Sequence, residues 1–166
     1  MNLNIKGIAI SIPDCALEQL VLERFAANDH RGALVSAGTL PRIGAEFAEL
    51  GGVFAGVMRG CDGAPDYYLI VGPEASSTLT WQKALDWAEG VTHLGFDYFC
   101  LPFRKEQALC FANVPELFKA EWYWSQEQYA DGSVYAWGQY FGNGYQSHLL
   151  KDGYSRARAV RRVPIQ

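Results

Sequence analysis

The sequence predicts an α+β fold with a β-hairpin, two helices and a C-terminal antiparallel meander. Two apolar, β-rich runs flank an Asp-Gly turn, two segments with helical spacing follow, and short strand-like runs separated by glycine turns end the chain. This order of elements favours helices grouped against an antiparallel sheet. The 166 residues fit one domain, and 49% of them are hydrophobic, which is ample for a buried core.

The first 50 residues predict an N-terminal strand/helix appendage, and residues 51–166 predict the main domain. Residues 3–12 alternate loosely, as a strand does, and a helix is expected over residues 14–27. Residues 28–50 contain several glycines and a proline and predict an irregular connection. The expected helix has an apolar face too large to leave in water. We therefore expect it to dock on the main domain or on a second copy, which would make a homo-oligomer.

The main domain begins with the hairpin and the two helices. Residues 53–58 and 67–71 predict the two hairpin strands. The first helix is expected directly after Thr80, whose hydroxyl can cap its N-terminus. The second helix is expected over residues 104–113, because Pro115 disfavours a helical conformation in the residue before it.

The last 45 residues predict the meander. Its strands are expected at 122–125, 134–141, 145–150 and 154–163, with glycine-containing turns before the last two. Because strand residues alternate between two faces, some of the many rings must point inward. Four apolar side chains are expected to share one core: Trp81, Leu85, Trp124 and Trp137.

Several motifs of the main domain occur in a characteristic order. They are residues 80–88, 101–109, 123–125, 136–137, 141–144 and 156–162. Together they cover roughly residues 50–163, and this run resembles the Lcl C-terminal-like domain family, whose relatives are often encoded by bacteria and their prophages. The resemblance implies a C-type-lectin-like fold and a general binding role. It does not imply a particular ligand, because fold does not fix function.

Two positions depart from the pattern of that family. Its helix usually opens after a segment like Trp-Arg-Leu-Pro-Thr, whereas here Cys100 and Phe103 take the Arg and Thr places. Loss of a Thr cap costs about 1 kcal/mol of helix stability, so other groups must satisfy the first amides of this helix. We expect the apolar Phe103 to pack beneath the N-terminal appendage.

No motif of catalysis or metal binding is evident. The three histidines lie far apart, and neither a nucleophile elbow nor a paired-cysteine spacing is present. The tripeptides that bind Ca²⁺ and sugar in calcium-dependent lectins are also missing. We therefore expect calcium-independent binding without a cofactor and no enzymatic activity.

The four cysteines lack the spacing of a secreted disulfide framework. We therefore expect free, buried thiols in a reducing compartment at all four positions, Cys15, Cys61, Cys100 and Cys110. An alternative from another class is an enzyme of the sulfatase-activating (formylglycine-generating) type. In that alternative Cys100 and Cys110 would correspond to the cysteine pair of such enzymes.

The meander concentrates aromatic and amide side chains. Surfaces rich in Tyr, Ser, Asn and Gly are typical of paratopes, because rings supply contact area and short polar groups adapt. This composition predicts a non-enzymatic recognition protein whose meander binds a protein or glycan ligand. The candidate ligand-binding residues are Tyr129, Tyr140, Asn143, Tyr145, Gln146 and His148.

A competing site is the basic end of the chain. Strand alternation places Arg156, Arg158 and Arg162 on one face, where they could form a basic patch for phosphate. The alternative is that these arginines pair with acidic groups of neighbouring strands. The net charge of −4 gives no general reason to expect nucleic acid as a partner.

The sequence shows neither a signal peptide nor an apolar run long enough for a membrane span. We therefore expect a cytoplasmic or virion-associated protein, with no membrane partner. Two versions of the recognition role stay open. In one, a phage receptor-binding protein is displayed on the virion tail. In the other, a phage accessory protein binds and blocks a host factor, such as a defence component, inside the cell.

Overall fold

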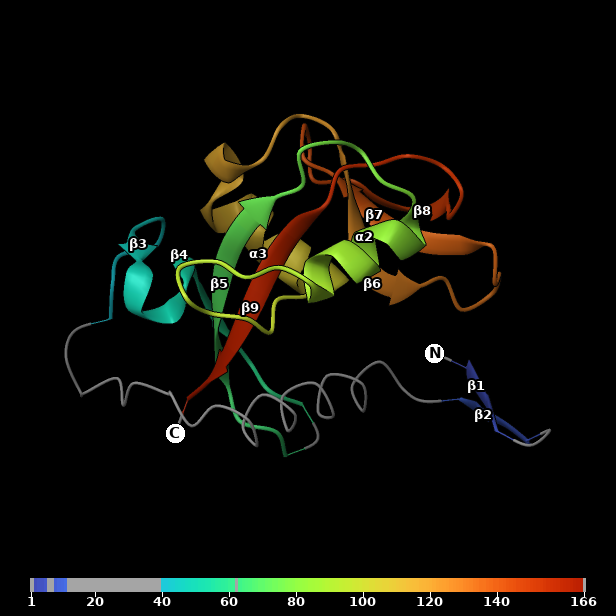
Figure 1. Ribbon diagram of the computed structural model, residues 1–166, viewed down its shortest axis with the longest axis horizontal. Coiled ribbons are helices and arrows are strands. Elements are labelled where there is room, and N and C mark those ends of the chain that lie inside the picture. Colours follow the sequence, from blue (N-terminus) through green and yellow to red (C-terminus); the bar gives the residue numbers. More distant parts are fainter. Residues whose placement is uncertain (1, 6–7, 12–39, 62, 166) are drawn as a thin grey trace.

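The computed structural model describes residues 2–5, 8–11, 40–61 and 63–165, and its architecture is α+β (Figure 1). The fold class expected from the sequence is therefore confirmed at this level. The helix expected over residues 14–27 lies outside the described residues.

The N-terminal segment forms a hairpin of its own. Strands β1 (Asn2–Ile5) and β2 (Ile8–Ser11) pair antiparallel, with Leu3 opposite Ile10. The single strand expected over residues 3–12 is thus two strands, because loose alternation does not show where a strand reverses.

The first of the two larger sheets has the strand order β3-β4-β5-β9, and all its pairs are antiparallel. Its strands are β3 (Glu46–Phe47), β4 (Gly52–Met58), β5 (Tyr67–Glu74) and β9 (Arg158–Pro164). The register of β4 and β5 confirms the expected hairpin. A 3₁₀ turn, Ala48–Leu50, joins β3 to β4, so this sheet already begins within the segment expected to be an irregular connection.

The last strand does not belong to the meander. We expected residues 154–163 to close it, but β9 pairs with β5, with Val160 opposite Val71, and the two strands run side by side in Figure 1. The central part of β5 is apolar and buried on both faces, so its backbone groups need a neighbour on each side. Alternation predicts that a strand forms, but it does not identify the partner of that strand.

The second sheet is the remaining three-stranded meander. It consists of β6 (Trp122–Gln128), β7 (Tyr135–Tyr140) and β8 (Gln146–Leu150), paired antiparallel in that order. The turn between β7 and β8 contains Gly144 in the left-handed region, at φ 80°. A Cβ atom there would also lie 2.7 Å from a ring carbon of Phe111, so the turn requires glycine.

The two described α-helices follow β5. Helix α2 spans Trp81–Glu89 and helix α3 spans Arg104–Asn113, with a 3₁₀ turn at Pro115–Leu117. The bounds expected for the second helix are therefore confirmed. Thr80 is the N-cap residue of α2, but its side chain makes no capping hydrogen bond.

The helices pack against opposite faces of the three-stranded sheet. Trp124 of β6 is fully buried in one core with Ala84 and Ala88 of α2. The neighbouring Tyr123 faces the other side and packs in a second core with Cys110 of α3. That core also contains residues of β4, β5 and β9, so α3 lies between the two larger sheets, behind β5 and β9 in Figure 1.

Trp137 does not share the core of Trp124. Trp124 pairs with Gly138, so the adjacent Trp137 points to the opposite face and is only partly buried. The expected common core is correct for Trp124, against which Trp81 and Leu85 pack, and wrong for Trp137.

Candidate binding site

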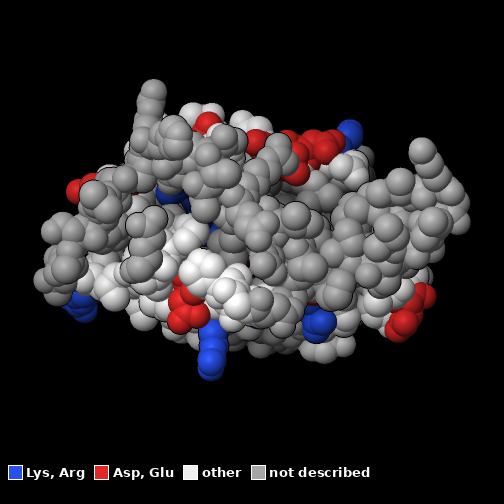
Figure 2. Space-filling view, turned by 90° about the horizontal axis from the view of Figure 1, so that it is seen from below, with Lys and Arg blue, Asp and Glu red and all other residues white. Residues whose placement is uncertain are grey.

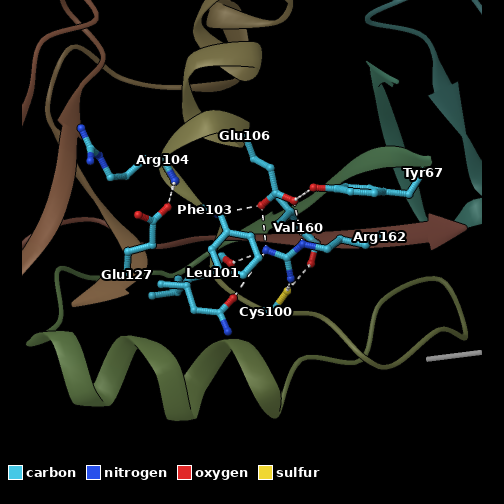
Figure 3. A network of polar contacts seen from close by, with 10 residues as sticks. Tyr67, Cys100, Leu101, Phe103, Arg104, Glu106, Glu127, Val160 and Arg162 are labelled. Carbon is cyan, nitrogen blue, oxygen red and sulfur yellow. Dashed lines mark hydrogen bonds and ion pairs between the residues drawn. The ribbon is translucent and has the colours of Figure 1, made fainter. Parts of the chain in front are cut away.

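A buried polar network lies at the start of helix α3 (Figure 3). The carboxylate of Glu106 accepts hydrogen bonds from Tyr67 Oη at 2.7 Å, from Arg162 Nε at 2.6 Å and from Arg162 Nη2 at 2.7 Å. Arg162 also donates to the sulfur of Cys100 and to the carbonyl oxygen of Leu101. The Arg162 and Glu106 side chains are both fully buried, so this bidentate ion pair is shielded from water.

The same network replaces the missing threonine cap of α3. The main-chain N–H of Phe103 donates to Glu106 Oε2 at 2.7 Å, and the N–H of Arg104 donates to Glu127 Oε1 of β6 at 2.7 Å. The ring of Phe103 is buried beneath the Arg162 guanidinium, with Cζ 4.2 Å from the ring centroid. Contact of Phe103 with the helix expected over residues 14–27 lies outside the described residues.

Arg104 projects from this capped helix end onto the meander. Its guanidinium stacks on Trp137, with Cζ 3.5 Å from the ring centroid. Its Nε donates to Gln146 Oε1 at 3.2 Å, and Gln146 Nε2 in turn donates to the Arg104 carbonyl oxygen at 2.8 Å. Gln146 Nε2 also donates to Gln139 Oε1 at 2.7 Å. Helix α3 and strands β7 and β8 thus hold the arginine in one orientation.

Four rings gather beside Arg104, and we call Tyr129, Tyr135, Trp137 and His148 the aromatic cluster. His148 stacks on Tyr129 with ring centroids 4.5 Å apart, and Tyr135 meets His148 edge-on at 5.1 Å. Tyr129 lies edge-on to Trp137 at 5.4 Å. His148 is exposed and the other rings are half-buried, so the cluster is open to solvent and fixed by its own contacts.

A second group of rings lies on the opposite face of the sheet. Trp122 contacts Tyr140 and Tyr145, with ring centroids 5.7 and 6.2 Å away. Tyr145 is 62% exposed, and Asn143 Oδ1 accepts a hydrogen bond from its main-chain N–H. Because Trp122 pairs with Tyr140, these rings share the face of Trp124 and not that of Trp137.

The six candidate ligand-binding residues therefore do not form one surface. Tyr129, Gln146 and His148 lie with the aromatic cluster, whereas Tyr140 and Tyr145 lie on the opposite face and Asn143 lies in the turn between β7 and β8. Sequence reasoning missed Arg104 and its contact with Trp137. The sequence signal for this contact was weak, because the position of Arg104 at the start of a helix does not indicate which strand residue its side chain contacts.

The arginines of the competing basic patch are engaged by acidic groups. Arg162 is in the buried network, and Arg156 and Arg158 each contact Glu74, with N–O distances of 3.2 and 3.3 Å. Arg156 also pairs with Glu121 at 2.8 Å, and this hydrogen bond raises the pKa of Arg156. In Figure 2 the visible Lys and Arg side chains stand apart from one another. A continuous surface row of these three arginines is excluded, because Arg162 is only 1% exposed.

The two described cysteines near α3 are free and buried. Burial raises the pKa of the Cys100 thiol to about 11, although Arg162 acts in the opposite direction, and burial together with Glu106 raises the pKa of Cys110. Reactive cysteines have lowered pKa values and access to solvent, so these two thiols have the character of core side chains. Cys61 is disulfide-bonded, so the expectation of a free thiol is wrong there.

Within the described part of the chain, no group of three or more His, Cys, Asp or Glu side chains is arranged to hold a metal ion. None of the described helices is long and apolar enough to cross a membrane.

Comparison with known proteins gives no family for this chain. No protein-family model matches it, and no curated protein matches it. The resemblance of residues 50–163 to the Lcl C-terminal-like domain family therefore stays a prediction.

Proposed function

We propose that this chain is a non-enzymatic recognition protein with a C-type-lectin-like fold, which binds a protein or glycan ligand through its meander. The observation that carries the proposal is the aromatic cluster with Arg104 stacked on Trp137. Partly exposed rings held in place by neighbours supply contact area at low entropic cost, and Tyr, Trp and Arg are the side chains enriched at binding hot spots.

The ligand contacts the face of the meander that bears the cluster. This face contains Tyr129, Gln146 and His148 of the expected site. It also contains Arg104, whose orientation is fixed by its contacts with Trp137 and Gln146. The second ring group, Tyr140 and Tyr145, lies on the other face and takes no part in the same contact. A virion-displayed role and an intracellular role would both use the cluster face.

Immobilised full-length protein, probed with a glycan panel and with a displayed peptide library, tests this proposal. Ligands recovered by the wild type are titrated against a Tyr129→Ala/His148→Ala variant. Hot-spot rings contribute about 2 kcal/mol or more, so affinity should fall at least about thirtyfold without loss of the fold.

Two matched variants serve as controls. Tyr140→Ala/Tyr145→Ala removes rings from the opposite face, and Tyr154→Ala removes a tyrosine that is 69% exposed outside both ring groups. Both should bind as the wild type does. If neither the glycan panel nor the peptide library yields a ligand, or if the Tyr129→Ala/His148→Ala variant binds fully, the proposal is contradicted.

A further inference from the structure

The outer edge of strand β8 carries main-chain groups available for pairing. Tyr140 N donates to Tyr145 O at 2.8 Å, and Lys151 N donates to Val134 O at 3.0 Å. Because hydrogen-bonded and non-bonded pairs alternate in an antiparallel ladder, Ser147 and Leu149 also point their main-chain groups toward β7. The main-chain N–H and C=O groups of Gln146, His148 and Leu150 consequently point away from β7.

Apart from the carbonyl oxygen of Leu150, these outward main-chain groups form no hydrogen bond with another described residue. β8 is an edge strand of its sheet, and no other described strand lies beside it. One outward carbonyl is used, since Leu150 O accepts from Gly153 N at 2.9 Å. Such an edge is a template for an additional strand.

Gln146, His148 and Leu150, whose main-chain groups point outward, place their side chains on the face of the sheet that bears the aromatic cluster. Gln146 bonds to Arg104, His148 contacts three rings of the cluster, and Leu150 pairs with Tyr135 and is 51% exposed. A strand added at this edge would therefore place every second side chain on the cluster face, within reach of the Arg104 guanidinium.

The guanidinium of Arg104 has donors left for a ligand. Nε is used by Gln146 and one face of the group is covered by Trp137. Nη1 and Nη2 bond to no other described residue, and in Figure 3 the guanidinium points away from Glu127, whose carboxylate binds the Arg104 main-chain N–H. A planar pair of terminal nitrogens held in one orientation matches a carboxylate.

We propose that β8 and Arg104 together form a docking site for an extended peptide segment bearing an Asp or Glu side chain. The segment adds as a fourth strand beside β8, hydrogen-bonded to the main chain of Gln146 and His148, and its carboxylate binds Nη1 and Nη2 of Arg104. Main-chain bonds supply affinity and the alternate side chains supply specificity, as in other cases of strand addition. The inference rests on the proposed recognition function and specifies its ligand as an acidic peptide.

The probe is a displayed library of random nine-residue peptides, selected on the full-length protein. Enriched peptides should contain a carboxylate among β-branched residues and lack proline at the centre. The tightest binder is then synthesised together with its Glu→Gln or Asp→Asn counterpart and with a form N-methylated at one main-chain amide of the pairing edge. Both changes should weaken binding roughly tenfold or more, since each removes charged or main-chain hydrogen bonds.

The protein variant is Arg104→Gln, and Lys83→Gln is its control, because it removes the same charge from an exposed position of α2. Arg104→Gln should lower the affinity for the acidic peptide roughly tenfold and abolish the difference in affinity between the acidic peptide and its amide counterpart. Lys83→Gln should leave the affinities for both peptides unchanged. Equal melting temperatures exclude loss of the fold as the cause.

Three results would overturn the inference. They are enrichment of peptides without a carboxylate, binding that survives Arg104→Gln or N-methylation, and a dimer of this chain that occludes the edge of β8. If no peptide binds but a glycan does, and binding requires Tyr129 and His148, the inference fails while the proposed function stands.

Discussion

Removing the charge of Glu106 should destabilise the protein more than any surface charge change. In Glu106→Gln the Arg162 guanidinium loses a bidentate partner at 2.6 and 2.7 Å in a place where both side chains have no exposure. Breaking a buried pair from one side costs about 3–5 kcal/mol, because the remaining charge is left without compensation. The substitution also weakens the cap on the Phe103 amide.

A double-mutant cycle separates the interaction free energy of the ion pair from the other effects of each substitution. Arg162→Met leaves the carboxylate of Glu106 buried without its cation, so it should cost a similar amount, about 3–5 kcal/mol. In Glu106→Gln/Arg162→Met neither charge remains, and the loss should not exceed that of the worse single variant. The magnitude of the interaction free energy in this cycle is then at least that of the smaller single loss, about 3 kcal/mol.

Urea unfolding followed by tryptophan fluorescence measures these differences. Glu121→Gln is the control, because it removes one partner of Arg156 at the surface and should change the midpoint little. If Glu106→Gln costs less than about 1 kcal/mol, or if the two single effects add, the ion pair does not stabilise the start of α3.

Two further predictions concern the core. Trp124→Ala should lower the free energy of unfolding in urea by about 3–5 kcal/mol, because it empties a fully buried site and removes the hydrogen bond from Nε1 to the Leu79 carbonyl oxygen. Trp122→Ala is the control, and its cost should be smaller because Trp122 is only half-buried. Stability should also fall as the pH rises from about 9 toward 11, since the folded-state pKa of Cys100 is raised from 9.0 to about 11 and that of Cys110 is raised too. The folded state holds these protons more tightly than the unfolded state, so stability is complete below the unfolded pKa and is lost above it. A Cys100→Ala/Cys110→Ala variant with an equally steep loss over this range would refute the assignment to the thiols.

The sequence predicts local elements better than their partners. The hairpin of β4 and β5 and the bounds of α3 follow from apolar periodicity, an Asp-Gly turn and Pro115. The partner of β9 does not follow from these signals, because β9 pairs with a strand more than eighty residues earlier in the chain. Long-range pairing depends on which buried strand lacks a neighbour, and periodicity within β9 contains no information on that.

The same limit holds for single side chains of the candidate site: the sequence predicts local alternation but not which face of the sheet is buried. Alternation correctly separates Trp137 from Tyr140 within β7, but only the pairing of Trp124 with Gly138 shows that Trp137 faces away from the α2 core. One residue of register decides whether an aromatic ring fills the core or is available to a ligand. Composition therefore predicts that the meander is the binding element, but it does not predict which of the two faces of the meander binds.

The buried network and the proposed binding face are physically connected through the first turn of α3. Glu106 and Glu127 hold the amides of Phe103 and Arg104, and Gln146 holds both the carbonyl and the Nε of Arg104. An arginine fixed in this way loses little conformational entropy when it binds a carboxylate, and such preorganisation increases affinity without additional contacts. The buried ion pair that stabilises the helix start therefore also orients the cation of the proposed site. A stability effect at Glu106 and a binding effect at Arg104 should consequently be coupled, although Glu106 itself cannot touch a ligand.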